Sequence, residues 1–210
     1  YRFGMPGPKI SNKETKKILD TVSNLDPYPE YIVISGSIPK GVESNIYAQM
    51  TKIAKENGAK VIVDASNQPL KEAMNEGVYL IKPNLGEFQD LIGKELQDED
   101  EIRDAALDLI NNKCCNTIVI SLGAGGAVLI TKDKTRYFRP PTVPIKSKVG
   151  AGDSMVAGIV LSLAKNNDLE KSVIYGLAAG SAAVMTPGTE LCTKEDTEKL
   201  YKKMLEELYN

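Results

Sequence analysis

The apolar residues of this chain fall into short continuous runs, separated by longer segments with helical spacing. The first three runs are YIVIS at 31–35, VIVD at 61–64 and YLIK at 79–82. Runs of this length that are apolar throughout and rich in β-branched residues are typical of strands buried on both faces of a sheet. Residues 44–57 repeat apolar side chains at helical spacing and end at Gly58, which predicts a helix between the first two strands.

The same alternation continues through the second half of the chain. Residues 98–110 predict a helix, and TIVIS at 117–121 and AVLI at 127–130 predict two strands around a glycine turn. From about Gly152 the pattern is mostly helical. Strands joined by helices form parallel sheets through right-handed crossovers. We therefore predict one α/β domain over residues 1–210, with a doubly wound, mostly parallel sheet and helices on both faces.

Composition and charge narrow the function classes. The 210 residues are 42% apolar and 26% charged, which is typical of folded globular chains. The formal net charge is −2, so there is no excess of basic residues for nucleic acid or an anionic membrane surface. No apolar run is long enough to span a bilayer, and no cationic-then-apolar leader opens the chain. We therefore expect a cytoplasmic protein with no nucleic-acid or membrane partner.

The chain contains no histidine, which excludes whole classes of catalysis. Ser-His-Asp and Cys-His nucleophiles, histidine-ligated zinc and imidazole acid–base chemistry all require that residue. The three cysteines lack the C-x-x-C spacing of zinc or redox sites, so we interpret them as incidental thiols. Proton transfer then depends on carboxylate, lysine, tyrosine or cysteine side chains.

The most informative segment is VGAGDSMVAG at 149–158. Two glycines flank Ala151 directly before an apolar helix, so free backbone N–H groups and the helix dipole can bind an anion there. Asp153 stands in the first turn, where it can take a proton from a hydroxyl while the amides hold a phosphoryl group. The segment is neither a P-loop nor a dinucleotide fingerprint. The alternative interpretation is a plain helix cap, in which Asp153 only complements the dipole.

The segment KPNLGE at 82–87 combines an amide and a carboxylate at a predicted helix start. Asn84 and Glu87 are three residues apart and share one face, which suits a hydrated Mg²⁺ beside nucleotide phosphates. The alternative is that Asn84 is an N-cap and Glu87 its capping-box partner.

Three further segments have two interpretations each. The glycines of SLGAGG at 121–126 allow close passage over a planar or phosphate group, or simply a tight hairpin. The hydroxyls of SGSIPKG at 35–41 can bind a sugar or cap the next helix. Arg2 can meet a phosphate or lie on the solvated surface.

Taken in this order, the segments resemble those of the ribokinase-like (PfkB) family of sugar kinases, and the resemblance covers essentially the whole chain. It implies an ATP-dependent phosphotransferase of glycolytic type. Within the family, YRF-x-MPGP, SGSIPKG and PGTELC look most like the minor type of 6-phosphofructokinase, which converts fructose 6-phosphate to fructose 1,6-bisphosphate. The alternatives are a fructose-1-phosphate kinase, a tagatose-6-phosphate kinase, or a non-catalytic nucleotide-binding fragment.

The resemblance also implies roles for individual residues. Asp153 would be the catalytic base, with Gly150, Ala151 and Gly152 as the anion hole. The residues implied at ATP are Lys82, Asn84, Ser121, Gly123, Gly125, Gly126 and Ser181. Arg2, Ser37 and Asp153 would meet the sugar phosphate. Glu87 would hold Mg²⁺ through water, and a monovalent cation, K⁺, would be held by Ser147, Val149, Ala183 and Gly188.

The resemblance has one large departure and one small one. Family members carry an N-terminal segment with a glycine-rich sugar-binding motif, a lid and much of a dimer interface, which these 210 residues do not include. We therefore expect the C-terminal portion of a longer fold, a homodimer in the full-length protein, and no kinase activity from this portion alone. The small departure is Lys148, which stands where the family usually has a small hydroxyl residue.

Overall fold

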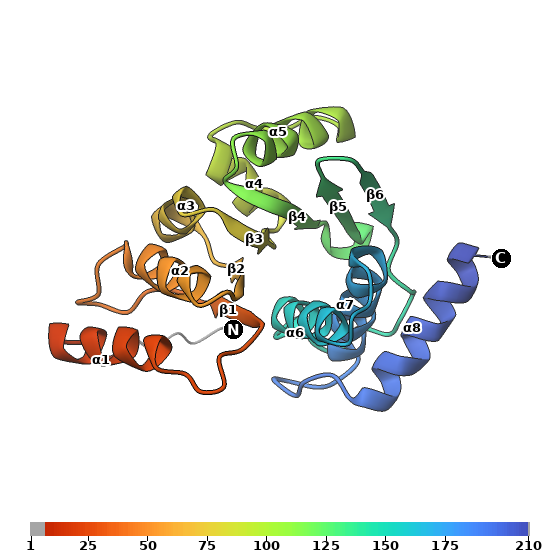
Figure 1. Cartoon of the computed structure of the whole chain (residues 1–210). Helices are drawn as coiled ribbons and strands as arrows, with labels where there is room; N and C mark the ends of the chain where they lie inside the picture. Colours follow the sequence, from red (N-terminus) through yellow and green to blue (C-terminus); the bar gives the residue numbers. More distant parts are fainter. Residues whose placement is uncertain (1–6, 210) are drawn as a thin grey trace. The chain divides into compact units, whose positions relative to one another are not determined.

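The computed structural model describes residues 7–209 and divides after Asn116 into two compact units (Figure 1). The elements of the first unit are α1 (Asn12–Ser23), β1 (Tyr31–Ser35), α2 (Ile46–Glu56), β2 (Lys60–Asp64), α3 (Asn67–Asn75), β3 (Val78–Ile81), α4 (Leu85–Ile92) and α5 (Glu99–Asn111). The elements of the second are β4 (Cys115–Ser121), which begins just before the boundary, the short 3₁₀ turn η1 (Gly123–Gly125), β5 (Ala127–Thr131), β6 (Thr135–Phe138), α6 (Ala151–Ala164), α7 (Leu169–Val184) and α8 (Lys194–Tyr209).

The first unit is built around three parallel strands. β1 pairs with β2 and β2 with β3, so that Val63 lies between Ile34 and Ile81 in the register. The aliphatic residues of β2 and β3 are fully buried, as expected for a sheet that is covered by helices. α2 packs against β2 and has α1 and α3 as neighbours. Parallel pairing brings the carboxyl ends of the three strands to one edge of the sheet.

The second unit combines an antiparallel meander with three helices. β4 pairs with β5 and β5 with β6, all antiparallel. α6 and α7 pack so closely that a Cβ added to Gly158 would lie 2.9 Å from the Cβ of Ala179, and one added to Gly176 would lie 2.6 Å from Ile159. Glycine at these positions therefore lets the two helix backbones approach each other.

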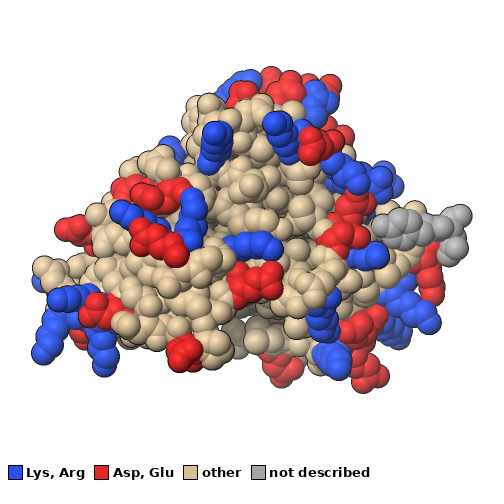
Figure 2. All heavy atoms as spheres, viewed as in Figure 1, with Lys and Arg blue, Asp and Glu red and all other residues tan. Residues whose placement is uncertain are grey.

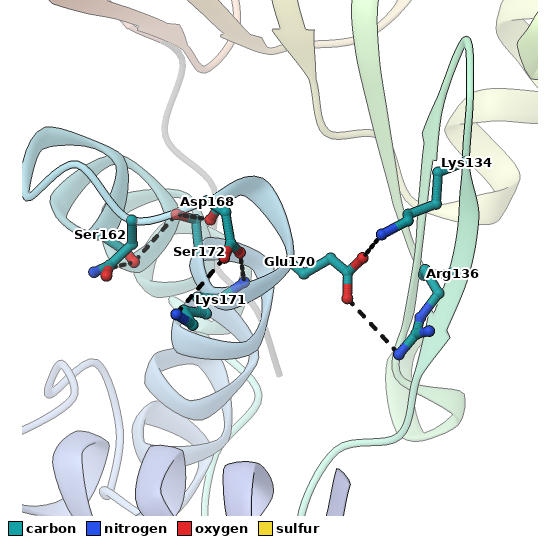
Figure 3. Close-up of polar contacts among 8 residues, drawn as sticks. Lys134, Arg136, Ser162, Asp168, Glu170, Lys171 and Ser172 are labelled. Atoms are coloured by element: carbon teal, nitrogen blue, oxygen red, sulfur yellow. Dashed lines mark hydrogen bonds and ion pairs between the residues drawn. The ribbon is translucent and has the colours of Figure 1, made fainter. Parts of the chain in front are cut away.

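Polar contacts join the start of α7 to its surroundings (Figure 3). The Glu170 carboxylate pairs with Lys134, just before β6, and with Arg136 on β6 at 3.7 Å. The buried Ser172 hydroxyl donates to that of Ser162 on α6 at 3.1 Å. One turn of α7 is therefore linked both to the meander and to the preceding helix.

The structure confirms the predicted α/β class and the strands predicted in both halves of the chain, although β2 and β3 start one residue earlier and β4 two residues earlier than predicted. α1 and β6 were not predicted. α1 has no buried residue and β6 is only four residues long, so neither carries much apolar signal. The parallel arrangement does not extend to β5, which is apolar throughout and yet antiparallel to both neighbours. The single domain over residues 1–210 stays a prediction. Within residues 7–209, no helix has the length and apolar character needed to cross a membrane.

Candidate functional site

Polar residues follow the three parallel strands of the first unit at their shared carboxyl edge. β1 ends at Ser35 and is followed by Gly36 and Ser37, β2 ends at Asp64, and β3 is followed by Lys82. Ser35 and Asp64 are direct partners in the register, and the Gly36 N–H donates to the Asp64 carbonyl at 3.2 Å. Open α/β sheets bind their ligands at this edge, so these residues are candidates for ligand binding in the first unit.

A buried ion pair lies at that edge. The Lys82 ammonium is 3.3 Å from the Asp64 carboxylate, and their side chains are only 6% and 16% exposed. A charge this far from water needs a partner of opposite sign, which each group supplies to the other. Lys82 was predicted at the nucleotide, whereas Asp64 was not predicted in the site. The one sequence signal for Asp64 is that a carboxylate closes an otherwise apolar strand.

Asn84 and Glu87 form the capping box that was predicted as the alternative to a ligand site. The Glu87 N–H donates to Asn84 Oδ1 at 2.9 Å, and the Asn84 N–H donates to Glu87 Oε2 at 2.9 Å. The box uses one oxygen of each side chain and fixes both at the start of α4. Capping and ligand binding are therefore compatible, and the role of these residues at ATP and Mg²⁺ stays a prediction.

The residues between 7 and 209 hold no group of three or more histidine, cysteine, aspartate or glutamate side chains that could bind a metal. A magnesium ion at Glu87 does not need one, because Mg²⁺ keeps several waters and takes phosphate oxygens with one or two carboxylates. The Glu87 carboxylate therefore fits a hydrated, nucleotide-borne Mg²⁺, and its binding stays a prediction.

Tyr47 of α2 supports the loop that follows β1. The Tyr47 hydroxyl, which is buried, lies 3.4 Å from the Ser35 carbonyl and 3.3 Å from that of Gly36, and donates to them. Burial raises the pKa of Tyr47, so the hydroxyl keeps the proton that it donates. Ser37 is exposed on this supported loop, and its contact with a sugar stays a prediction. Arg2 lies outside the described residues.

In the second unit, a glycine turn opens α6. Gly150 is the N-cap with φ of 78°, a left-handed conformation that favours glycine. The Ser154 N–H makes the first helical bond, to the Gly150 carbonyl at 2.8 Å, so the earlier N–H groups of the turn have no acceptor within the helix. Gly152 and Asp153 are both exposed in this turn. A helix start and a carboxylate thus share one exposed turn, and anion binding by Gly150, Ala151 and Gly152 and the catalytic role of Asp153 stay predictions.

The predicted cation residues come from two segments that are joined by hydrogen bonds. The Ser147 hydroxyl donates to the Gly188 carbonyl at 2.6 Å and accepts the Val149 N–H at 3.2 Å. The Ala183 carbonyl begins the same 183–188 segment and accepts the Thr186 hydroxyl at 2.7 Å. Hydroxyl and carbonyl oxygens are the donors that suit K⁺. The chemistry of this set therefore fits a monovalent cation, and its binding stays a prediction.

The segment at 121–126 is the hairpin connection between β4 and β5, so the hairpin interpretation is correct. A Cβ on Gly126, which has φ of 97°, would lie 1.9 Å from the Phe138 carbonyl, so only glycine fits there. Gly123 and Gly125 are exposed at the tip of the hairpin, where they remain candidates for ATP contact. Ser181, the remaining residue predicted at ATP, is buried in α7.

Lysine and arginine side chains are interspersed with aspartate and glutamate on the face shown in Figure 2. This mixture agrees with the formal net charge of −2.

Comparison with known proteins gives a consistent picture. The profile of the pfkB family carbohydrate kinases matches residues 4–196. The chain is 39% identical over 202 residues to the ATP-dependent 6-phosphofructokinase isozyme 2 of Escherichia coli, covering 96% of this chain and 65% of that protein. It is 36% identical to the enzyme of the same name from Mycobacterium tuberculosis, covering 96% of this chain and 59% of that protein.

The crystal structure of Escherichia coli phosphofructokinase-2 in complex with potassium matches with a TM-score of 0.92 and 39% identity. The match covers 98% of this chain and 66% of that one. The chain thus spans about two thirds or less of the length of the relatives it matches.

Proposed function

The chain belongs to the PfkB carbohydrate kinase family, and we propose that the complete protein transfers the γ-phosphoryl group of ATP to the C1 hydroxyl of fructose 6-phosphate. The products are fructose 1,6-bisphosphate and ADP. The observation that carries the proposal is the exposed turn that opens α6, where Asp153 stands beside free backbone amides. Support for the substrate comes from the two relatives, which are both ATP-dependent 6-phosphofructokinases.

In this reaction Asp153 accepts the proton of the C1 hydroxyl as the oxygen attacks the phosphoryl group. The amides of Gly150, Ala151 and Gly152 stabilise the negative charge on the transferring group. Base and anion hole belong to one helical turn, so their relative geometry is set by the backbone before substrate binds. Such positioning and charge stabilisation supply most of the rate in phosphoryl transfer.

The proposal also assigns residues that would hold the nucleotide. Lys82 and Asn84 would bind its phosphates, and the hairpin tip with Ser121, Gly123, Gly125 and Gly126 would lie against the nucleotide, with Ser181 near the adenine. Glu87 would bind a nucleotide-borne Mg²⁺ through water, and this ion supplies charge neutralisation at the phosphates. A monovalent cation on Ser147, Val149, Ala183 and Gly188 would stabilise the segments that flank the α6 turn.

Two alternative substrates and one alternative class remain open. Fructose 1-phosphate and tagatose 6-phosphate offer the same kind of hydroxyl, and Ser37 and Arg2 alone do not discriminate between these sugars. A nucleotide-binding protein without turnover would use the same phosphate contacts. For the complete protein we propose a homodimer with ATP and a phosphosugar as its ligands.

A coupled assay of ADP release on the complete protein tests the proposal. Fructose 6-phosphate, fructose 1-phosphate and tagatose 6-phosphate are compared at equal ATP and Mg²⁺, and we expect the highest kcat/KM with fructose 6-phosphate. An equal or higher value with fructose 1-phosphate would contradict the substrate. ATP binding without ADP release from any sugar would favour the non-catalytic alternative.

A further inference from the structure

The buried pair of Lys82 and Asp64 is not explained by packing. Their side chains are 6% and 16% exposed, with ammonium and carboxylate 3.3 Å apart. Taking two charges out of water is costly, and buried pairs seldom make a fold more stable than apolar residues of the same size would. Ile62 and Leu80, which precede Asp64 and Lys82 by two residues and therefore lie on the same face of the sheet, are fully buried and apolar, so the core here accepts apolar residues readily. The pair therefore calls for a functional explanation.

The backbones of Asp64 and Lys82 are both fixed by hydrogen bonds, whereas their side chains differ in flexibility. The Asp64 carbonyl accepts the Gly36 N–H at 3.2 Å, and the Lys82 N–H donates to the Val63 carbonyl at 3.2 Å. Both backbones are thus fixed at the carboxyl ends of adjacent parallel strands. The aspartate side chain is short and follows its backbone closely, whereas the lysine ammonium sits on a flexible four-carbon stem. Asp64 is consequently the group that gives the Lys82 ammonium a defined direction.

We infer that Asp64 is a positioning residue for nucleotide binding, acting through Lys82; the inference rests on the proposed function. The carboxylate balances the charge of Lys82 before nucleotide binds and holds the ammonium at the edge of the sheet. An ammonium has three donors, and the pair with Asp64 uses one of them. The phosphates of a nucleoside triphosphate then meet a donor that is already oriented, which lowers the cost of binding.

A competing effect has the opposite sign, because a carboxylate near the phosphates also repels them. In the pair, however, the charge of Asp64 is neutralised by Lys82, and the repulsion that remains is that of a dipole, which is weaker than that of a free charge. We therefore expect loss of orientation to outweigh relief of repulsion when Asp64 is replaced.

The test measures ATP binding by calorimetry in the complete protein, with variants arranged as a double-mutant cycle. Asp64→Asn should weaken ATP binding at least about tenfold, the loss expected for a hydrogen bond to a charged group. In a Lys82→Gln background, the same change should alter the affinity by less than about twofold, because the group on which it acts is gone. Asp64→Glu keeps the charge and should recover part of the loss. Asp108→Asn, at an exposed position on α5, is the matched control and should leave the affinity unchanged.

A spectroscopic measurement separates positioning from a general loss of structure. In protein with ¹⁵N-labelled lysine side chains, the paired Lys82 ammonium should give a slowly exchanging signal, which is assigned by its absence from Lys82→Gln. Asp64→Asn should remove that signal while the backbone amide spectrum stays folded. Equal weakening by Asp64→Asn with and without Lys82, or no weakening at all, would overturn the inference alone. If the unsubstituted protein binds no ATP, the proposed function itself fails, and the inference fails with it.

Discussion

At the scale of single residues, the proposed chemistry is concentrated in the first turn of α6. Asp153 is exposed there, and the N–H groups that precede the first helical bond lie on the same turn. Because the chain has no histidine, a carboxylate is the natural proton acceptor in this turn. A helix cap and a general base would look alike in this geometry, but they differ in what a substitution changes.

Asp153→Asn keeps the shape of the side chain and removes the proton acceptor. General-base catalysis is typically worth about 10²–10⁴-fold, or roughly 3–5 kcal/mol of transition-state stabilisation. In the complete protein we expect kcat to fall by at least that order while ATP affinity is unchanged or slightly higher, because a negative charge is lost. Steady-state kinetics and ATP calorimetry on the same preparation measure both. Near-normal kcat together with a much lower Tm would instead identify Asp153 as a helix cap.

A second prediction at this scale concerns Tyr175 of α7. Burial, with a hydrogen bond to Glu198 at 2.9 Å, raises the pKa of Tyr175 from 10.0 to about 12. Above pH 10 the unfolded chain loses this proton first, so the contribution of Tyr175 to stability is present below pH 10 and is lost as the pH rises towards 12. The shift corresponds to about 2–3 kcal/mol.

Urea unfolding of the wild type and Tyr175→Phe at pH 8, 10 and 11 checks this expectation. The variant lacks the titrating group, so the stability advantage of the wild type should shrink as the pH rises above 10. A difference that stays constant over this range would show that Tyr175 titrates alike in the folded and unfolded chain.

At the scale of elements, α4 and α7 show two ways in which the sequence holds a helix start. α4 relies on neighbours three residues apart in the chain, since the reciprocal bonds of Asn84 and Glu87 are local. The start of α7 relies on long-range contacts as well. Glu170 reaches Lys134 and Arg136 from more than thirty residues away in sequence. The meander is thereby tied to the helix that carries Ser181 and, at its end, Ala183.

Glu170→Gln removes the negative charge that pairs with Lys134 and Arg136 and keeps the size of the side chain. The carboxylate is 16% exposed, but Lys134 and Arg136 are 53% and 44% exposed, so water screens much of the attraction. We expect a loss of about 1 kcal/mol or less in the free energy of unfolding. Glu207→Gln, in the exposed Lys203–Glu207 pair of α8, is the matched control and should change stability still less. A loss of several kcal/mol on Glu170→Gln would show that the pair behaves as a buried one.

At the scale of the whole molecule, the chain forms two compact units, and each contains some of the predicted site residues. The first contains Lys82 and Asp64, and the second contains the α6 turn and the predicted cation residues. The relatives are longer, and this chain spans 65% of the Escherichia coli enzyme that it matches. Kinase activity requires nucleotide, sugar and exclusion of water together.

We therefore expect the 210-residue chain by itself to show no measurable phosphorylation of fructose 6-phosphate and to be less stable than the complete protein. ADP-release assays and thermal unfolding of both forms at equal concentration measure the two effects. Nucleotide binding by the 210-residue chain is compatible with this expectation. Turnover comparable with that of the complete protein would contradict it and would place the whole catalytic site within these residues.

Local features of the protein were determined by its sequence alone. Apolar runs and helical spacing predicted the strands of both units and the helices between them, because side-chain periodicity is set by backbone geometry. The capping box at Asn84 and the glycine turn before Asp153 could also be predicted, because their interactions span only a few residues. Elements with little buried surface, α1 and β6, left no such pattern and were missed.

Only the tertiary structure decided the contacts between residues far apart in the chain. It paired Asp64 with Lys82, placed the Ser147 hydroxyl on the Gly188 carbonyl, and brought Gly126 so close to Phe138 that no side chain fits between them. It also made β5 antiparallel, although its apolar residues suit either direction. The physical reason is common to all four cases. Strand direction and side-chain pairing depend on how the connecting segments bring distant parts of the chain together. The local spacing of apolar and polar residues does not determine this.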